Sequence, residues 1–333
     1  MGKDMDNKDY LAFVFKHLKG LDVRDKISLL TLLEKRVGKE ISISGVKECI
    51  SGHFARNLKA LDAAFKAADK EIKAVEKSSV KFISIFSPLY PPLLKEIFDP
   101  PFILFYRGLL PESYERTVGV VGTRYPSGAA LSAAFDMGFG FGVNGVRVVS
   151  GLALGIDRHS HIGNMAAEMP AIAVLGNGID EIYPYANRKL AYHMLDEGGV
   201  IFSEFGPGVP PSKFTFPKRN RIISGLSSAI VVVQAPKRSG ALITADYAAE
   251  QGREVYVSEA GLPFPQGAGG LALTEQGAKS VTGPVDVMMD MGWEIEFPVY
   301  KTDSLKEAEQ HQLLSWELDD KAVNNYGIYY FKK

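Results

Sequence analysis

Short runs of apolar residues recur through the middle of the chain and alternate with longer stretches of helical pattern. The runs are rich in valine and isoleucine, and the stretches between them have ordinary helix lengths. Six runs follow one another: Val118–Val121, Val146–Val149, Ala171–Val174, Val200–Phe202, Ile230–Val233 and Glu254–Val257. Continuously apolar strands separated by helices indicate a parallel sheet buried on both faces. The pattern predicts an α/β domain over residues 80–292, an extended Rossmann-like, doubly wound and mostly parallel sheet.

The two ends of the chain have different patterns. Apolar residues recur at helical spacing over residues 11–18, 27–37 and 53–77, which predicts a small helical domain over residues 1–79. A proline-rich break at residues 87–92 then leads to a short predicted strand at residues 102–106. Residues 293–333 read as a short acidic tail with a strand-like end at residues 326–331.

Composition and charge narrow the class of protein. The chain is 46% hydrophobic and 23% charged, which is typical of a globular protein and not of a disordered one. Its 38 Lys and Arg against 39 Asp and Glu give a net charge of −1, so total charge does not indicate nucleic acid. The single cysteine, Cys49, excludes an internal disulfide and a cysteine-based zinc site. No apolar run approaches the ~20 residues of a membrane span, and residues 1–9 lack the apolar core of a signal peptide. We expect a cytoplasmic location without a membrane partner.

Glycine-rich segments repeatedly follow the predicted strands. Loops at the carboxyl ends of parallel strands gather at one sheet edge, where ligands bind at the topological switch point. Glycine lets the backbone approach an anion, and exposed N–H groups at helix starts attract negative charge. These loops supply a first set of candidate contacts: Gly122, Thr123, Arg124, Ser127, Ser150, Gly151 and Gly176.

The common catalytic and nucleotide-binding signatures are missing. There is no P-loop, no H-E-x-x-H, no G-x-S-x-G elbow, and Gly176-Asn-Gly178 lacks the third glycine of a dinucleotide fingerprint. His159 and His161 are two residues apart, so they point to different faces of a helix, and we expect no metal site there. Asp157 is better interpreted as an acid in the first turn of that helix.

A basic window at residues 211–240 contains no Asp or Glu. Basic side chains neutralise phosphates and neighbouring aromatic rings stack on bases, so the window favours an extended anion. Its candidate contacts are Lys213, Phe214, Phe216, Lys218, Arg219, Asn220 and Arg221, followed at the next helix start by Ser239, Gly240 and Thr244. Structural roles stay open: Arg219 or Arg221 could satisfy carbonyls or pair with Glu204, Phe216 could be core, and Ser239 could be an N-cap.

Several long motifs occur in one order. They are Gly122-Thr-Arg124, Ser150-Gly-Leu-Ala-x-Gly-Ile-Asp157, Ala171-x-Ala-Val-Leu-Gly-x-Gly-x-Asp180, Tyr183-Pro-x-x-Asn187, Ser203-Glu204, Phe216-Pro-x-Arg-Asn-Arg221, Ser239-Gly-Ala-Leu-Ile-Thr-Ala245 and Gly252-Arg253. This series resembles the DprA/Smf DNA-processing proteins over about residues 80–290.

The resemblance implies a Rossmann-like domain that binds single-stranded DNA, forms a homodimer and loads RecA in natural transformation or recombination. It implies no catalysis and no cofactor. Carried over by motif, Arg124 holds a phosphate, while Lys218, Arg219 and Arg221 line the same pocket with Phe216 beside the bases. It also implies that residues 293–333 are a remnant or an incomplete winged helix.

Two other classes of function remain open on the residues. A hydrolase that cleaves nucleoside monophosphates would use the same loops, with Glu204 or Asp157 as the catalytic carboxylate. A protein-interaction scaffold would keep the pocket without using it.

Overall fold

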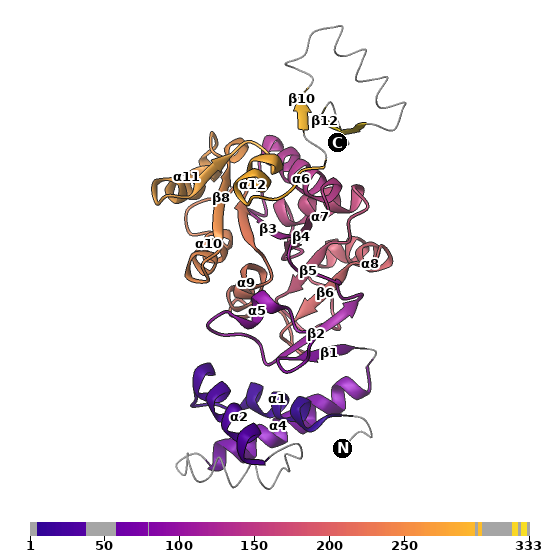
Figure 1. The fold of residues 1–333 in the computed structure, drawn as a ribbon, viewed down its shortest axis with the longest axis vertical. Coiled ribbons are helices and arrows are strands. Elements are labelled where there is room, and N and C mark those ends of the chain that lie inside the picture. The colour runs from indigo at the N-terminus through magenta and orange to yellow at the C-terminus, as the bar shows by residue number, and fades with distance from the viewer. Residues whose placement is uncertain are drawn as a thin grey trace.

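The computed structural model describes residues 5–37, 58–78, 80–296, 299–301, 322–325 and 328–331. Three helices at the N-terminal end lie below the sheet domain, and the C-terminal strands lie at the opposite end (Figure 1). The sheet domain between them carries all the predicted glycine loops.

Nine strands form one sheet in the order β1-β2-β6-β5-β4-β3-β7-β8-β9. Their bounds are β1 Lys81–Ser84, β2 Ile103–Gly108, β3 Thr117–Val121, β4 Arg147–Ser150, β5 Ile172–Leu175, β6 Val200–Ser203, β7 Ala229–Val232, β8 Glu254–Ser258 and β9 Lys279–Val281. Neighbours from β6 through β9 are parallel, whereas β2 pairs with β6, and β1 with β2, in antiparallel register. The mostly parallel, Rossmann-like α/β prediction is therefore confirmed.

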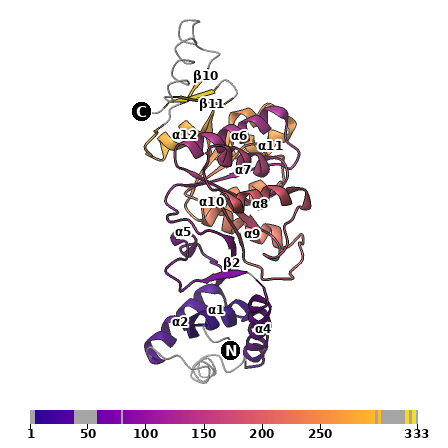
Figure 2. The same cartoon turned by 90° about the vertical axis from the view of Figure 1, so that its right-hand side faces the viewer.

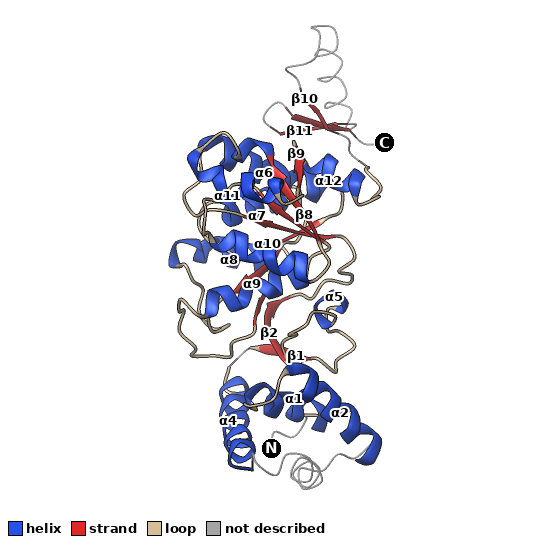
Figure 3. Ribbon diagram, turned by 90° about the vertical axis from the view of Figure 1, so that its left-hand side faces the viewer, coloured by secondary structure: helices blue, strands red, loops and turns tan. Residues whose placement is uncertain are grey.

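Helices cover both faces of this sheet, as Figure 3 shows. They are α5 Pro92–Lys95, α6 Gly128–Val143, α7 Ile156–Ala166, α8 Arg188–Asp196, α9 Thr215–Gly225, α10 Gly240–Glu250, α11 Ala268–Glu275 and α12 Pro284–Asp290. Alternate residues of β3 serve the two faces, because strand side chains alternate. Val118 and Val120 belong to a buried apolar cluster with α6, whereas Val121 belongs to the cluster that contains Ile222 and Ile223 of α9.

The N-terminal helices pack on the antiparallel edge of the sheet (Figure 2). They are α1 Asn7–His17, α2 Val23–Val37 and α4 Leu58–Glu76. Phe13 of α1 contacts Phe82 and Phe105 with ring centroids 5.1 and 6.0 Å away, and Phe15 stacks on Phe102 at 6.1 Å. One continuous apolar core thus joins these helices to β1 and β2.

All six predicted apolar runs and the predicted strand at residues 102–106 are strands in the structure. The strands β1 and β9 were not predicted, because each is short and begins with an exposed lysine. In the tail, β10 Val299–Lys301, β11 Ala322–Asn325 and β12 Ile328–Phe331 pair as a separate antiparallel sheet. The start of the predicted third helix, residues 53–57, and most of the tail lie outside the described residues. Within the part of the chain that is described, no helix has the length and apolar character to cross a bilayer.

Candidate nucleic-acid interface

The strand order places a pocket at the centre of the sheet. The chain leaves β3 toward β4 on one side, while β7 lies on the other, so β3 and β7 mark the topological switch point. A cavity of about 310 Å3, which we name the glycine-loop pocket, opens beyond the carboxyl ends of these two strands. Its lining residues are Val121, Gly122, Thr123, Arg124, Tyr125, Ala153, Asp157, Phe216, Arg219, Asn220, Ile223, Ser239, Gly240, Ala241 and Thr244.

The loop after β3 forms one wall of this pocket and is tied to the loop after β7. The Thr123 N–H donates to the Gln234 carbonyl at 2.7 Å, and the Ser127 N–H donates to the Gln234 side-chain oxygen at 2.8 Å. Ser127 is the N-cap of α6, and its hydroxyl accepts from the Ala130 N–H at 3.3 Å. Ser127 therefore holds the helix start and does not line the pocket.

Arg124 and Tyr125 project from the same loop into solvent. The Tyr125 side chain is 81% exposed, and the Arg124 guanidinium carbon lies 5.6 Å from the centroid of the Phe216 ring. Among the described residues, no carboxylate lies within ion-pair distance of Arg124. An unpaired guanidinium beside aromatic rings can bind a phosphate and leave the rings free for bases.

The loop after β4 is held from within by Asp157. One oxygen of Asp157 accepts the Gly151 N–H at 3.1 Å and the Ala153 N–H at 3.4 Å. Burial raises the pKa of Asp157, and the charge of Arg219 and these backbone N–H groups oppose the rise. The Ser150 hydroxyl donates to the Val120 carbonyl at 2.6 Å, so Ser150 and Gly151 shape the loop and do not line the pocket.

Helix α9 brings Phe216, Arg219 and Asn220 to the floor of the pocket. Arg219 is buried and donates from one nitrogen to the Gly151 carbonyl at 2.8 Å and to the Val174 carbonyl. Burial lowers the pKa of Arg219 to about 10, while the charge of Asp157 opposes the shift. Of the roles that the sequence left open for Arg219, the structure shows hydrogen bonding to backbone carbonyls.

Two of the predicted glycine contacts lie beneath these side chains. A Cβ on Gly176 would approach the Phe216 ring to 2.6 Å, and a Cβ on Gly151 would meet the Arg219 guanidinium. Neither glycine lines the pocket. Their lack of a side chain allows Phe216 and Arg219 to pack, which is a different reason for glycine than contact with a ligand.

The start of α10 forms the opposite wall. Gly240 is its first residue, and a Cβ there would meet no atom closer than 4.0 Å, so the backbone faces open space. Ser239 is the N-cap residue but makes no capping bond, and its hydroxyl has no hydrogen-bond partner in the described part of the chain. The Asn220 side chain donates to the Gly240 carbonyl at 2.9 Å, and Thr244 is buried one turn further on. A free hydroxyl at a helix N-terminus is suited to an anion.

Arg221 lies on the other side of α9, and the structure does not bring it to this pocket. Its guanidinium pairs with Glu204 at 2.8 Å and with Asp99 at 3.0 Å. Burial alone would lower the pKa of Arg221, but these two carboxylates raise it overall. The predicted pairing of Arg221 with Glu204 is present. Arg221 and Arg219 are two positions apart on α9, so they point to different sides of the helix, and neither Arg221 nor Glu204 lines the glycine-loop pocket.

Three further predicted contacts lie on the exposed start of α9 or just before it. Phe214 is 75% exposed, with the Lys213 ammonium 5.2 Å from its ring centroid. The Lys218 side chain is 50% exposed and pairs with Glu204 at 3.1 Å. They do not line the pocket, but Lys218 lies on the helix that forms its floor, and Lys213 and Phe214 lie directly before that helix.

The sequence did not single out Tyr125 as a pocket residue, and it placed Asp157 near these loops only as the catalytic carboxylate of the hydrolase alternative. Tyr125 follows Arg124 directly, so its position was a signal that could have been used. Asp157 was assigned to the first turn of the helix that follows, where it lies, and it also lines the pocket. No cluster of three His, Cys, Asp or Glu residues able to hold a metal ion occurs in the ranges the structure describes.

The fold and the pocket define a class: a Rossmann-like α/β protein with a crevice lined by glycine loops at the switch point of its sheet. Residues 81–292 match the family model described as DNA recombination-mediator protein A. The chain is 39% identical to the DNA processing protein DprA of Bacillus subtilis over 66% of this chain and 74% of that protein. It is 33% identical to the Smf protein of Borreliella burgdorferi over 80% of this chain and 83% of that protein. The crystal structure of DNA processing protein A from Streptococcus pneumoniae superposes with a TM-score of 0.74 at 32% identity, covering 87% of this chain and 100% of that one. The chain belongs to the DprA/Smf family of DNA-processing proteins.

Proposed function

We propose that this protein binds single-stranded DNA in the glycine-loop pocket, mainly through phosphates, and catalyses no reaction there. The observation that carries the proposal is Arg124, an exposed and unpaired cation at the pocket mouth beside Phe216 and Tyr125. The unpartnered Ser239 hydroxyl and the open backbone at Gly240 supply further groups for an anion. Such contacts tolerate any base sequence.

The hydrolase alternative has less support from the geometry. Glu204 is paired with Lys218 and Arg221 outside the glycine-loop pocket. Asp157 is the one carboxylate among the pocket's lining residues, and its oxygen already accepts two backbone N–H groups. A general acid or base must reach the substrate proton, and this carboxylate is engaged by its own loop.

The test is the affinity for oligo-dT measured by fluorescence anisotropy. Charge-assisted contacts to phosphate contribute about 1.5–3 kcal/mol, so Arg124→Ala should weaken binding roughly tenfold to a hundredfold. Arg188→Ala is the matched control, because Arg188 also lies over exposed aromatic rings but does not line the pocket. Equal affinities for the two variants would contradict the proposed site.

We further propose that the protein acts as a homodimer and delivers the bound strand to the recombinase RecA, as the family resemblance implies. Two pockets on one strand raise avidity through effective concentration. Light scattering at micromolar concentration should give about 73 kDa, twice the 36.4 kDa of the chain. A monomer that still binds oligo-dT tightly would contradict the proposed homodimer. A dimer that fails to speed RecA filament formation would contradict the proposed delivery of the strand to RecA.

A further inference from the structure

A second polar cavity lies where the N-terminal helices meet the sheet domain. Its volume is about 160 Å3, whereas one water molecule requires roughly 10–15 Å3 of such space. We name it the junction pocket; its lining residues are Lys16, His17, Val23, Lys26, Asp99, Pro100, Phe102, Glu204, Phe205 and Lys218. Helices α1 and α2 thus contribute to it together with α9 and the segment before β2.

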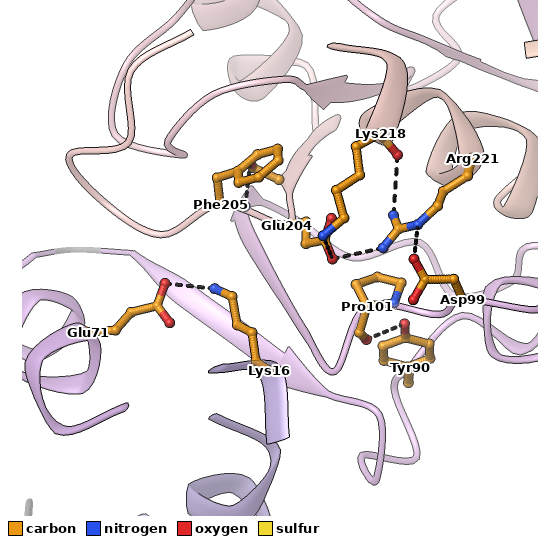
Figure 4. Close-up of polar contacts among 10 residues, drawn as sticks. Lys16, Glu71, Tyr90, Asp99, Pro101, Glu204, Phe205, Lys218 and Arg221 are labelled. Carbon is orange, nitrogen blue, oxygen red and sulfur yellow. Dashed lines mark hydrogen bonds and ion pairs between the residues drawn. The ribbon is translucent and has the colours of Figure 1, made fainter. Parts of the chain in front are cut away.

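The carboxylates around this pocket already have cationic partners, as Figure 4 shows. Lys16 pairs with Glu71 at 2.6 Å, Lys218 with Glu204 at 3.1 Å, and Arg221 with Asp99 at 3.0 Å. His17 also contacts Glu71 at 2.8 Å. Each of the three carboxylates is therefore neutralised by at least one lysine or arginine.

Lys26 is the cation left over. It is 8% exposed, it lines the junction pocket, and none of the described carboxylates lies within ion-pair distance of its ammonium. Its contact with a side chain is the Phe102 ring, whose centroid lies 5.7 Å from the nitrogen. Burial lowers the pKa of Lys26, with Asp99 opposing the shift, so its charge is not well solvated. The side chain of Lys26 is largely buried and its ammonium has no carboxylate partner, and an anion in the cavity would supply one.

We propose that the junction pocket is a second anion site, which binds a phosphate group through Lys26 with Lys16 and Lys218 beside it. Four cations, Arg221 included, face three carboxylates here, and the surplus charge is at Lys26. The cavity has room for a tetrahedral oxyanion, and ammonium groups bind phosphate as point charges.

Helix α9 connects this site to the glycine-loop pocket. Lys218 lines the junction pocket, while Phe216, Arg219 and Asn220 of the same helix line the other. A phosphate of the bound strand or a free phosphate could therefore fill the site. Binding of free phosphate does not depend on the proposed function, whereas use of the site by the strand rests on it.

The experiment titrates the full chain with inorganic phosphate by calorimetry, with chloride at matched ionic strength as the reference. Every variant also carries Arg124→Ala, so that the glycine-loop pocket contributes less. Lys26→Met should weaken phosphate binding about tenfold or more, because it removes a charge-assisted contact. Lys26→Arg should stay within about threefold, since it keeps the charge. Lys70→Met, which removes an exposed lysine of α4, is the matched control and should bind normally.

Equal phosphate affinity in Lys26→Met and Lys70→Met would overturn the site. So would the absence of phosphate binding in the protein that carries Arg124→Ala alone. If Lys26→Met fails to fold, lysine-selective NMR on the unsubstituted chain gives a second measurement. Phosphate must then shift the Lys26 ε-methylene resonance, assigned with Lys26→Arg, and an unshifted resonance overturns the proposal.

A DNA arm identifies the source of the phosphate. If the strand enters the junction pocket, Lys26→Met alone should reduce the salt slope of oligo-dT binding by about 0.7. An unchanged slope with phosphate binding lost would assign the site to a free phosphate. The proposed function is tested by oligo-dT binding of Arg124→Ala, whereas the junction pocket is tested by phosphate binding of Lys26→Met. Failure of one can therefore be distinguished from failure of the other.

Discussion

Arg219 should mainly stabilise the folded protein, although it is one of the three basic residues in the motif at the start of α9. Arg219 is 5% exposed, and its guanidinium donates to the carbonyls of Gly151 and Val174. These two carbonyls belong to the ends of different parallel strands or the loops that follow them. We therefore expect Arg219→Met to loosen the floor of the glycine-loop pocket.

The magnitude follows from the contacts. Two hydrogen bonds from a charged group contribute about 1.5–3 kcal/mol each, so their loss costs roughly 3–6 kcal/mol. Removing a buried guanidinium also removes its desolvation penalty, which offsets part of that loss. We expect the free energy of unfolding to fall by about 3 kcal/mol.

Urea denaturation followed by circular dichroism measures this change. A loss of about 3 kcal/mol lowers the urea midpoint by roughly 1 M. Arg124→Met is the control, because Arg124 is exposed and surface substitutions stay within about 0.5 kcal/mol. A loss below about 1 kcal/mol for Arg219→Met would refute the structural role.

The remaining predictions concern base stacking and pH. Tyr125→Ala should weaken oligo-dT binding about fivefold to a hundredfold, because stacking contributes about 1–3 kcal/mol per base, whereas Tyr185→Ala, also exposed but outside the pocket, should not. His161 is buried, and burial lowers its pKa from 6.5 to about 3, so between these values the unfolded chain binds a proton that the folded chain does not. Stability should therefore fall as the pH drops below 6.5, and between pH 7 and pH 5 the wild type should lose about 2 kcal/mol more than His161→Leu. Parallel losses in the two proteins would contradict the neutral buried state of His161.

The sheet was largely predictable because its strands are continuously apolar and the stretches between them have ordinary helix lengths. Val118–Val121 and the five runs after it all became strands, since burial on both faces leaves a strong local signal. The antiparallel pairing of β2 with β6 was not predictable, because nearly a hundred residues separate these strands and no local pattern records their pairing. The packing of Phe13 on Phe105 is equally non-local.

The candidate site was predictable as a set of loops but not residue by residue. Strand ends and glycines located the edge of the sheet where Arg124, Ser239 and Gly240 meet. The fate of Arg219 and Arg221 depends on partners 68 and 122 residues away, which are Gly151 and Asp99. The charge of an arginine is visible in the sequence, but its burial and its partner are not.

The salt dependence of oligo-dT binding tests most directly whether the glycine-loop pocket binds a strand by its phosphates. Each neutralised phosphate of a single strand contributes about 0.7 to the slope of log K against log salt concentration. Arg124, Lys213 and Lys218 are the exposed cations on the pocket loop and around the start of α9, so we expect a slope of about −2 for each protomer. Arg124→Ala should reduce that slope by about 0.7. A slope near zero, or one that Arg124→Ala leaves unchanged, would contradict phosphate binding at this pocket.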